Sequence, residues 1–188
     1  EDLPLMPISD YNKSKMISER VLLSYQDKIT VQVIRPATVC GYSPRMRLDL
    51  SVNMLTMQAL TNGRITVFGG QQTRPNIHMN DMIGVYLHFL KLGSKEQGIY
   101  NAGFENISIL DIAKKVTDHI PAEIDIIESN DSRSYRQNSD KLLGTGFTPE
   151  YGVENGIIDV IVAYNSGRLL DEDNYYNIRA MKKLENFN

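Results

Sequence analysis

Amphipathic stretches and continuous apolar runs alternate along this chain of 188 residues. After a proline-punctuated entry, residues 10–26 carry a helical pattern that Ser9 or Asp10 can cap. Residues 30–36 form a run rich in apolar side chains that ends at Pro36, as is typical of a buried strand. A helix followed directly by a buried strand favours an α/β sheet.

The alternation continues along the rest of the chain. Further strands are predicted at about 65–68, 98–103 and 124–127, and further helices at about 49–60, 81–92, 109–120, 153–165 and 171–188. Residues 37–48 and 74–78 are predicted to be connections. The strands near residues 31 and 98 could be parallel members of one sheet, with residues 43–73 an excursion into a second lobe. A ligand would then lie between the lobes, where loops leave the carboxyl ends of strands.

Composition narrows the range of partners and compartments. The formal net charge is −3, with acidic and basic residues interleaved, which argues against general binding to nucleic acid or to an anionic membrane. No apolar stretch approaches the roughly 20 residues that span a bilayer. The single cysteine, Cys40, excludes an internal disulfide framework and is expected to be a small buried side chain. We expect a cytoplasmic protein with no membrane partner.

Tyr11 and Lys15 are the leading candidates for catalysis. Residues four apart share one face of a helix, so the ammonium group of Lys15 can lie beside the phenol of Tyr11 or a ligand between them. A phenol releases its proton only well above neutral pH, so a nearby cation that stabilises the phenolate makes it a usable acid/base. The spacing alone is common, and its interpretation depends on the neighbouring motifs.

His78 and Asp81 suggest a metal site at first sight. No third or fourth ligand follows at a plausible spacing, and the segment is expected to form a structural turn that opens a helix. We therefore predict no metal.

Several short motifs agree in order and spacing with one known family. They are Tyr11-Asn-Lys-Ser-Lys15, Val33-Ile-Arg-Pro-Ala-Thr-Val-Cys-Gly41, Val67-Phe-Gly-Gly-Gln-Gln-Thr-Arg-Pro75, Ile77-His-Met-Asn-Asp81, Tyr100-Asn-Ala-Gly103 and Asp131-Ser-Arg-Ser-Tyr-Arg136. The chain thereby resembles the carboxyl-terminal part of an extended short-chain dehydrogenase/reductase of the NAD-dependent sugar epimerase/dehydratase family. The resemblance covers nearly all of the sequence. One departure is Cys40, because the family usually has tyrosine there.

The resemblance implies a fold and a cofactor site. The fold would be a partial NAD-binding Rossmann-like, doubly wound sheet, contributed by residues 1–42 and 76–104, with a smaller α/β substrate-binding lobe from residues 43–75 and 105–188. Tyr11 would be the acid/base for the sugar hydroxyl, and Lys15 would hold the nicotinamide ribose. The cofactor pocket would also include Pro36, Ala37 and Val39. NAD is expected, and NADP stays open.

A nucleotide-diphosphate sugar is the substrate that the resemblance implies. A pyrophosphate on an acidic protein needs fixed, planar cationic donors, which arginine supplies. The residues implied in its binding are Asn53, Arg74, Arg133 and one arginine of the 43–47 loop, Arg45 or Arg47, with Arg136 an alternative to Arg133.

The family's glycine-rich phosphate loop and catalytic Ser/Thr would precede Tyr11, so the sequence is expected to be a fragment that has little activity alone. The reaction would be epimerisation or dehydration after transient oxidation of a sugar hydroxyl. A ketosugar reductase and a non-catalytic remnant or interaction module are the alternatives. A homodimer through the 10–27 helix is also implied.

Overall fold

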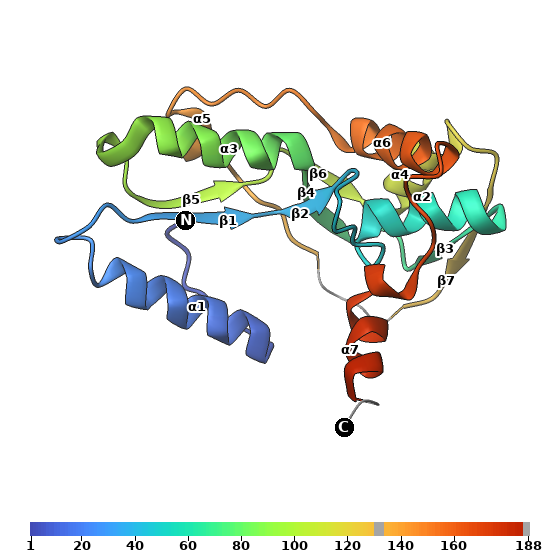
Figure 1. Ribbon diagram of the computed structural model, residues 1–188, viewed down its shortest axis with the longest axis horizontal. Coiled ribbons are helices and arrows are strands. Elements are labelled where there is room, and N and C mark those ends of the chain that lie inside the picture. Colours follow the sequence, from blue (N-terminus) through green and yellow to red (C-terminus); the bar gives the residue numbers. More distant parts are fainter. Residues whose placement is uncertain (130–133, 186–188) are drawn as a thin grey trace.

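The computed structural model describes residues 1–129 and 134–185. Its strands form three sheets that follow one another along the long axis of the molecule (Figure 1). Strand β1 (Gln32–Pro36) pairs in parallel with β5 (Gly98–Ala102), which confirms the pairing predicted for strands near residues 31 and 98. Strand β3 (Arg64–Phe68) pairs in parallel with β7 (Glu123–Ile127).

A third sheet joins the two halves of the molecule. Its central strand β4 (Thr73–His78) pairs in parallel with β2 (Thr38–Cys40) and in antiparallel fashion with β6 (Glu105–Ser108). The sequence interpretation was wrong for β2 and β4, which it treated as connections, and it missed β6. Strand β4 also runs across the lobe boundary expected between residues 75 and 76, so no linker separates the lobes there.

Helices make up much of the remaining chain. They are α1 (Asp10–Leu23), α2 (Ser51–Asn62), α3 (Met79–Leu92), α4 (Ile109–Thr117), α5 (Asp140–Leu143), α6 (Val153–Asn165) and α7 (Asn177–Glu185), with 3-10 turns η1 (Gly93–Lys95) and η2 (Asp173–Tyr175). Ser9 caps α1, since its side chain accepts a hydrogen bond from the Asn12 amide. None of the helices in the described ranges has the length and hydropathy that a bilayer span requires.

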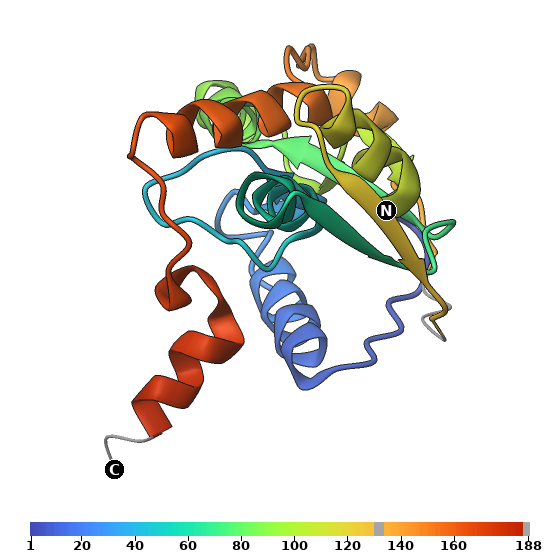
Figure 2. The same ribbon diagram turned by 90° about the vertical axis from the view of Figure 1, so that its right-hand side faces the viewer.

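Two buried clusters hold the sheets to their helices. Around β3, helices α2, α4 and α6 enclose Leu55, Ile65, Val67, Ile112 and Ile157 (Figures 1 and 2). Beneath α3, Val85 and Phe89 pack against Tyr100 and Ala102 of β5. Cys40 is 1% exposed, as expected of a small buried side chain. Burial, followed by the charges of Glu105 and Asp159, raises the pKa of its thiol to about 12.

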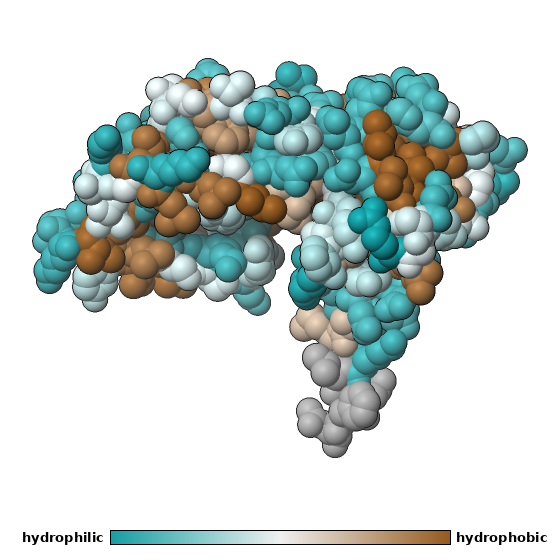
Figure 3. Space-filling model, turned by 45° about the horizontal axis from the view of Figure 1, so that its top comes forward, coloured by the Kyte–Doolittle hydropathy of each residue, from teal (hydrophilic) through white to brown (hydrophobic). Residues whose placement is uncertain are grey.

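Helix α1 lies differently from the others. It lies on the opposite side of the β1–β5 pair from α3 (Figures 1 and 2), and none of its residues is buried. Its apolar side chains Ile17, Val21 and Leu22 are about half exposed. Hydrophobic patches also interrupt the polar surface on the half of the molecule that holds α3 (Figure 3), where Leu87 and Leu90 are exposed.

Candidate active site

A groove of about 890 Å³ runs between α1 and strand β1. Its walls come from the amino-terminal segment, α1, β1 and two turns of α3. Tyr11, Lys15 and Glu19 line it from α1, and Arg35 and Pro36 line it from β1. The structure thus brings the predicted catalytic pair to the carboxyl end of a parallel strand, where α/β proteins commonly bind ligands.

The Tyr11 and Lys15 side chains lie together in this groove. The Lys15 ammonium nitrogen is 5.5 Å from the centroid of the Tyr11 ring, and the tyrosine is 69% exposed. This geometry follows from their spacing of four residues on α1, whose first turn is fixed by the Ser9 cap. A phenol and an ammonium group that line one groove together can exchange protons with a bound ligand.

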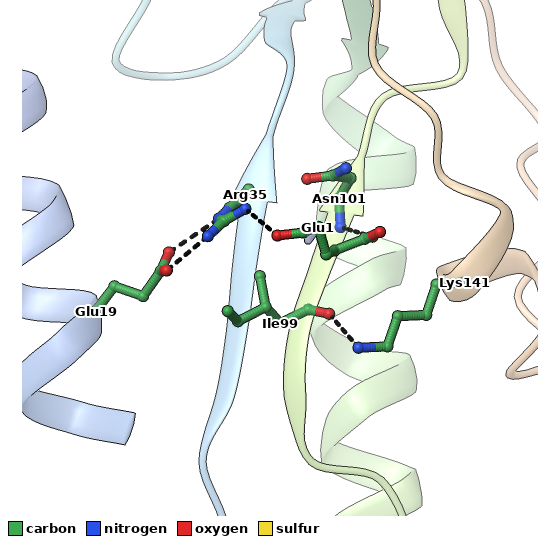
Figure 4. Close-up of polar contacts among 6 residues, drawn as sticks. All are labelled: Glu1, Glu19, Arg35, Ile99, Asn101 and Lys141. Atoms are coloured by element: carbon green, nitrogen blue, oxygen red, sulfur yellow. Dashed lines mark hydrogen bonds and ion pairs between the residues drawn. The ribbon is translucent and has the colours of Figure 1, made fainter. Parts of the chain in front are cut away.

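Glu19 and Arg35 form a bidentate ion pair between α1 and β1 (Figure 4). The guanidinium Nη2 is 2.6 Å from Glu19 Oε1, and Nε is 2.9 Å from Oε2. The hydrogen bond with Glu19 outweighs burial, so the pKa of Arg35 is raised. Sequence reasoning missed this pair. The available signal was that Glu19 follows Lys15 by four residues and therefore shares its helix face.

The amino terminus is tied to the same place. Arg35 Nη1 donates to the Glu1 carbonyl oxygen at 3.2 Å (Figure 4). The Glu1 carboxylate accepts from the backbone amide of Asn101 at 2.8 Å. Nearby, the Lys141 ammonium group donates to the Ile99 carbonyl oxygen at 2.8 Å. The β1–β5 pair is therefore held along its length by charged groups from three different segments.

The predicted cofactor residues of the β1–β2 segment divide into two sets. Pro36 lines the groove beside Tyr11 and Lys15. Ala37 and Val39 instead belong to the cluster beneath α3, where Ala37 is buried and its amide donates to the Ala102 carbonyl at 2.8 Å. A contact of either residue with a cofactor stays a prediction.

Asn53 bridges two parts of the chain. It is 2% exposed; its Oδ1 accepts from the Gly41 amide and its Nδ2 donates to the Arg47 carbonyl, both at 3.0 Å. Helix α2 therefore fixes the loop that follows β2. The nucleotide contact predicted for Asn53 is untested, and its observed bonds give it a role in shaping this loop.

The two candidate arginines of this loop differ in their surroundings. Arg45 is exposed, and its carbonyl accepts from the Ser43 hydroxyl at 2.9 Å. Arg47 forms a bidentate ion pair with Asp49, with distances of 2.7 and 3.1 Å. The Asp49 Oδ2 also accepts a hydrogen bond from the backbone amide of Asn177 at 3.1 Å. Arg47 thus anchors the start of α7, and Arg45 stays the predicted ligand contact.

Replacing Asp49 with asparagine is expected to loosen the carboxyl-terminal segment. Burial raises the pKa of Asp49, but hydrogen bonds from Arg47 and Asn177 more than offset this and lower it. Its contribution to stability is therefore present above the unfolded value of about 4 and is lost as pH falls through the lower folded value. After allowance for solvent screening we expect a loss of about 1 kcal/mol at neutral pH. Urea unfolding and amide exchange of residues 177–185 at pH 7 measure this effect, and unchanged exchange would contradict it.

Arg74 lies on β4 beside the 134–139 segment. Its guanidinium carbon is 5.3 Å from the centroid of the Tyr135 ring, and its Nη1 donates to the Thr73 carbonyl at 3.1 Å. The segment is bound to the strand at Thr73, which donates to the Ser134 hydroxyl and accepts from the Tyr135 amide. Arg133 lies outside the described residues. Its alternative, Arg136, is exposed.

The same segment crosses the carboxyl ends of β1 and β5. Gln137 Nε2 donates to the Arg35 carbonyl at 2.8 Å. The Ser139 hydroxyl donates to the Gly103 carbonyl at 2.8 Å and accepts from the Gly103 amide at 2.9 Å. The 134–139 segment therefore links the Arg74 region to the strand that carries Arg35.

His78 and Asp81 form hydrogen bonds that hold neighbouring backbone segments in place. His78 caps α3, since its Nδ1 accepts from the Asn80 amide, and its Nε2 lies 3.1 Å from Asp159. Helix α3 therefore begins two residues before the predicted start at residue 81. The Asp81 carboxylate accepts from the amides of residues 150 and 151, each at 3.0 Å. Within residues 1–129 and 134–185, no group of three His, Cys, Asp or Glu is placed to hold a metal ion.

A family model and several curated proteins match the chain. The model of the NAD dependent epimerase/dehydratase family matches residues 1–103. The chain is similar to dTDP-D-glucose 4,6-dehydratase of Bos taurus, with 29% identity over 205 residues that cover 100% of this chain and 54% of that protein. It is also similar to UDP-glucose 4-epimerase of Lactobacillus helveticus, with 28% identity over 62% of this chain and 42% of that protein. The chain spans about half the length of the curated relatives it matches.

Solved structures share the fold. The dTDP-glucose 4,6-dehydratase of Bacillus anthracis in complex with NAD has a TM-score of 0.76 at 20% identity, over 95% of this chain and 57% of that one. The UDP-glucuronic acid 4-epimerase of Bacillus cereus in complex with UDP-glucuronic acid and NAD has a TM-score of 0.74 at 26% identity. The match covers 88% of this chain and 55% of that one. The α/β fold described above is therefore Rossmann-like.

Proposed function

We propose, because this chain belongs to the NAD-dependent epimerase/dehydratase family, that it carries the acid/base residues of an enzyme that epimerises or dehydrates a nucleotide sugar. The observation that carries the proposal is the groove in which Tyr11 and Lys15 lie together at the carboxyl end of β1. Relatives that the chain resembles include both a dehydratase and an epimerase, so the proposal covers both reactions.

The groove has the donors that a nicotinamide ribose requires. Lys15 offers an ammonium group and Tyr11 a hydroxyl group, and both point into a space of about 890 Å³ that Pro36 helps to close. This volume lies in the range of small-molecule sites. When bound there, NAD would supply the oxidant for the sugar alcohol. We propose that Lys15, Tyr11 and Pro36 hold it, with Ala37 and Val39 supporting the strand end from behind.

Tyr11 is proposed to remove the proton from the sugar hydroxyl as the alcohol is oxidised, and to return it when the ketone is reduced. Lys15 is proposed to hold the nicotinamide ribose beside this phenol. Proton transfer by a positioned side chain commonly contributes about 10²–10⁴ to a rate. The same pair would serve either reaction, because both begin with oxidation of a hydroxyl group.

We propose that the substrate extends from this groove toward Arg74. Its guanidinium group can bind two phosphate oxygens at once. Arg45, in the loop after β2, and Asn53, on α2, are proposed for the same side. Arg133 belongs to the proposal as well, although it lies outside the described residues. The proposal divides the chain into two parts. The cofactor is bound by residues 1–42 and 76–104, and the nucleotide sugar is bound by residues 43–75 and 105–188.

The uncovered surface of α1 supports a proposed homodimer. Its apolar side chains Ile17, Val21 and Leu22 are about half exposed. A second copy of the 10–27 helix packed against them would bury these side chains. A free cysteine and a nicotinamide cofactor fit a cytoplasmic location for this assembly.

The proposal is tested by turnover. Full-length protein with NAD is incubated with UDP-, dTDP-, GDP- and CDP-sugars, and the products are identified by proton NMR. Conversion of one nucleotide sugar to its epimer or to a dehydrated ketosugar is expected. If no sugar nucleotide is converted or stabilises the protein against heat, the proposed function is wrong.

Replacing Arg74 with alanine is expected to raise KM for that nucleotide sugar about tenfold to a hundredfold, because a charge-assisted contact with phosphate is lost. Steady-state kinetics measures the change. Arg64→Ala is the matched control, since Arg64 is an exposed strand arginine paired with Glu123 and Asp125 at the far edge of the molecule. An equal effect of both substitutions would contradict a phosphate contact at Arg74.

A further inference from the structure

Helix α1 has few ties to the rest of the molecule. It buries none of its residues, although it carries the proposed catalytic pair. Within the described part of the chain, the hydrogen bonds that join an α1 side chain to another element are both donated by Arg35 to Glu19. The side chains of this ion pair are only 11% and 22% exposed, so water screens it weakly. The position of α1 on the sheet therefore depends strongly on one contact.

Arg35 also connects three other segments. Its Nη1 binds the Glu1 carbonyl, its backbone pairs with Asn101 of β5, and its own carbonyl accepts from Gln137. Gln137 belongs to the 134–139 segment, whose Tyr135 lies against Arg74. A chain of contacts thus leads from the helix with the proposed acid/base to the proposed phosphate arginine.

We propose that Glu19 and Arg35 are positioning residues for the reaction, which set the Tyr11/Lys15 face of α1 against the carboxyl end of β1 and align it with the Arg74 segment. This inference rests on the proposed function. Tyr11, Lys15 and Glu19 follow one another at intervals of four residues, so a rigid fork at Glu19 fixes the rotation of the helix and with it the direction of the other two side chains. A planar guanidinium group that grips both carboxylate oxygens does this better than a single flexible contact.

Glu19 is expected to act by holding α1 in place and not through the effect of its own charge on Tyr11. Eight residues of helix separate Glu19 from Tyr11, a rise of about 12 Å. Tyr11 is 69% exposed, so a charge at that distance from it is largely screened, because the Debye length is about 8–10 Å at physiological salt. Loss of the Glu19 charge should therefore leave the pH at which activity is half-maximal unchanged, while displacement of the helix lowers the rate.

The test uses Glu19→Gln and Arg35→Lys in the full-length protein, with Glu123→Gln as the control that breaks an exposed Arg–Glu pair at 3.0 Å elsewhere. We expect Glu19→Gln to lower kcat about tenfold to a hundredfold, the range for a displaced reacting group. The pH profile should keep its midpoints. Amide exchange of residues 10–23 should become faster in Glu19→Gln and remain at the wild-type rate in Glu123→Gln. The exchanged pair Glu19→Arg with Arg35→Glu should restore part of the lost rate.

The inference is overturned if Glu19→Gln keeps wild-type kcat and exchange, or if Glu19→Gln and Glu123→Gln have equal effects. A wild-type protein that converts no nucleotide sugar would refute the proposed function instead. In that case the exchange measurement still decides whether the ion pair positions α1. A midpoint shift in the pH profile would also overturn the inference, since it would show that the Glu19 charge acts on the acid/base directly.

Discussion

Replacing Tyr11 with phenylalanine is expected to lower kcat of the full-length protein about 10²–10⁴-fold. The substitution removes one hydroxyl group, which is the proposed proton acceptor for the sugar. The side chain is 69% exposed, so its loss should leave the fold intact. Steady-state turnover of the nucleotide sugar measures the effect, and thermal unfolding confirms that the variant is folded. KM should change little, because the lost interaction matters in the transition state.

Tyr25→Phe provides a closely matched control for this prediction. Tyr25 lies just beyond α1, is 49% exposed, and also has a lysine near its ring, with Lys28 Nζ 5.9 Å from the centroid. It does not line the groove that Tyr11 and Lys15 share. The control should keep wild-type kcat. Equal rates for Tyr11→Phe and the wild type would show that Tyr11 is no acid/base.

Gly41→Ala should destabilise the fold by about 2–4 kcal/mol, the sum of backbone strain and overpacking. Gly41 has φ of +98°, and a Cβ there would lie 2.8 Å from Nε2 of the buried His78. Its amide also donates to Asn53, so a shift of the backbone would break that bond and disturb the loop that carries Arg45. Urea unfolding measures the loss.

Gly63→Ala separates the two causes. Gly63 ends α2 with φ of +60°, but nothing lies within 4 Å of the position its Cβ would take. This variant should lose only the strain, about 1–2 kcal/mol. If the two variants were equally destabilised, crowding against His78 would contribute nothing.

The sequence predicted the elements whose signals are local. The Ser9 cap and the apolar run before Pro36 identify α1 and β1 without knowledge of their partners. Strands β2 and β4 were not predicted. Strand β2 has only three residues, and β4 contains Pro75, a residue type that usually argues against a strand. What makes β4 a strand is its position between β2 and β6, a long-range fact that the local pattern does not contain.

The candidate site divides in the same way. The Tyr11/Lys15 contact follows from a spacing of four on one helix, so it was predictable. The Glu19–Arg35 pair joins residues 16 apart on different elements, and the choice between Arg45 and Arg47 depends on Asp49 and Asn177, which packing brings together. Such contacts appear only once the elements are placed in space.

The account is tested most directly by a crystal structure of the full-length protein with NAD and the nucleotide sugar that it converts, using Tyr11→Phe to prevent turnover. We predict the reacting sugar hydroxyl within hydrogen-bonding distance, about 2.6–3.2 Å, of the position of the Tyr11 oxygen. The nicotinamide ribose should contact Lys15, and the diphosphate should contact Arg74. A sugar bound away from the groove between α1 and β1, with Lys15 touching neither ligand, would contradict the account.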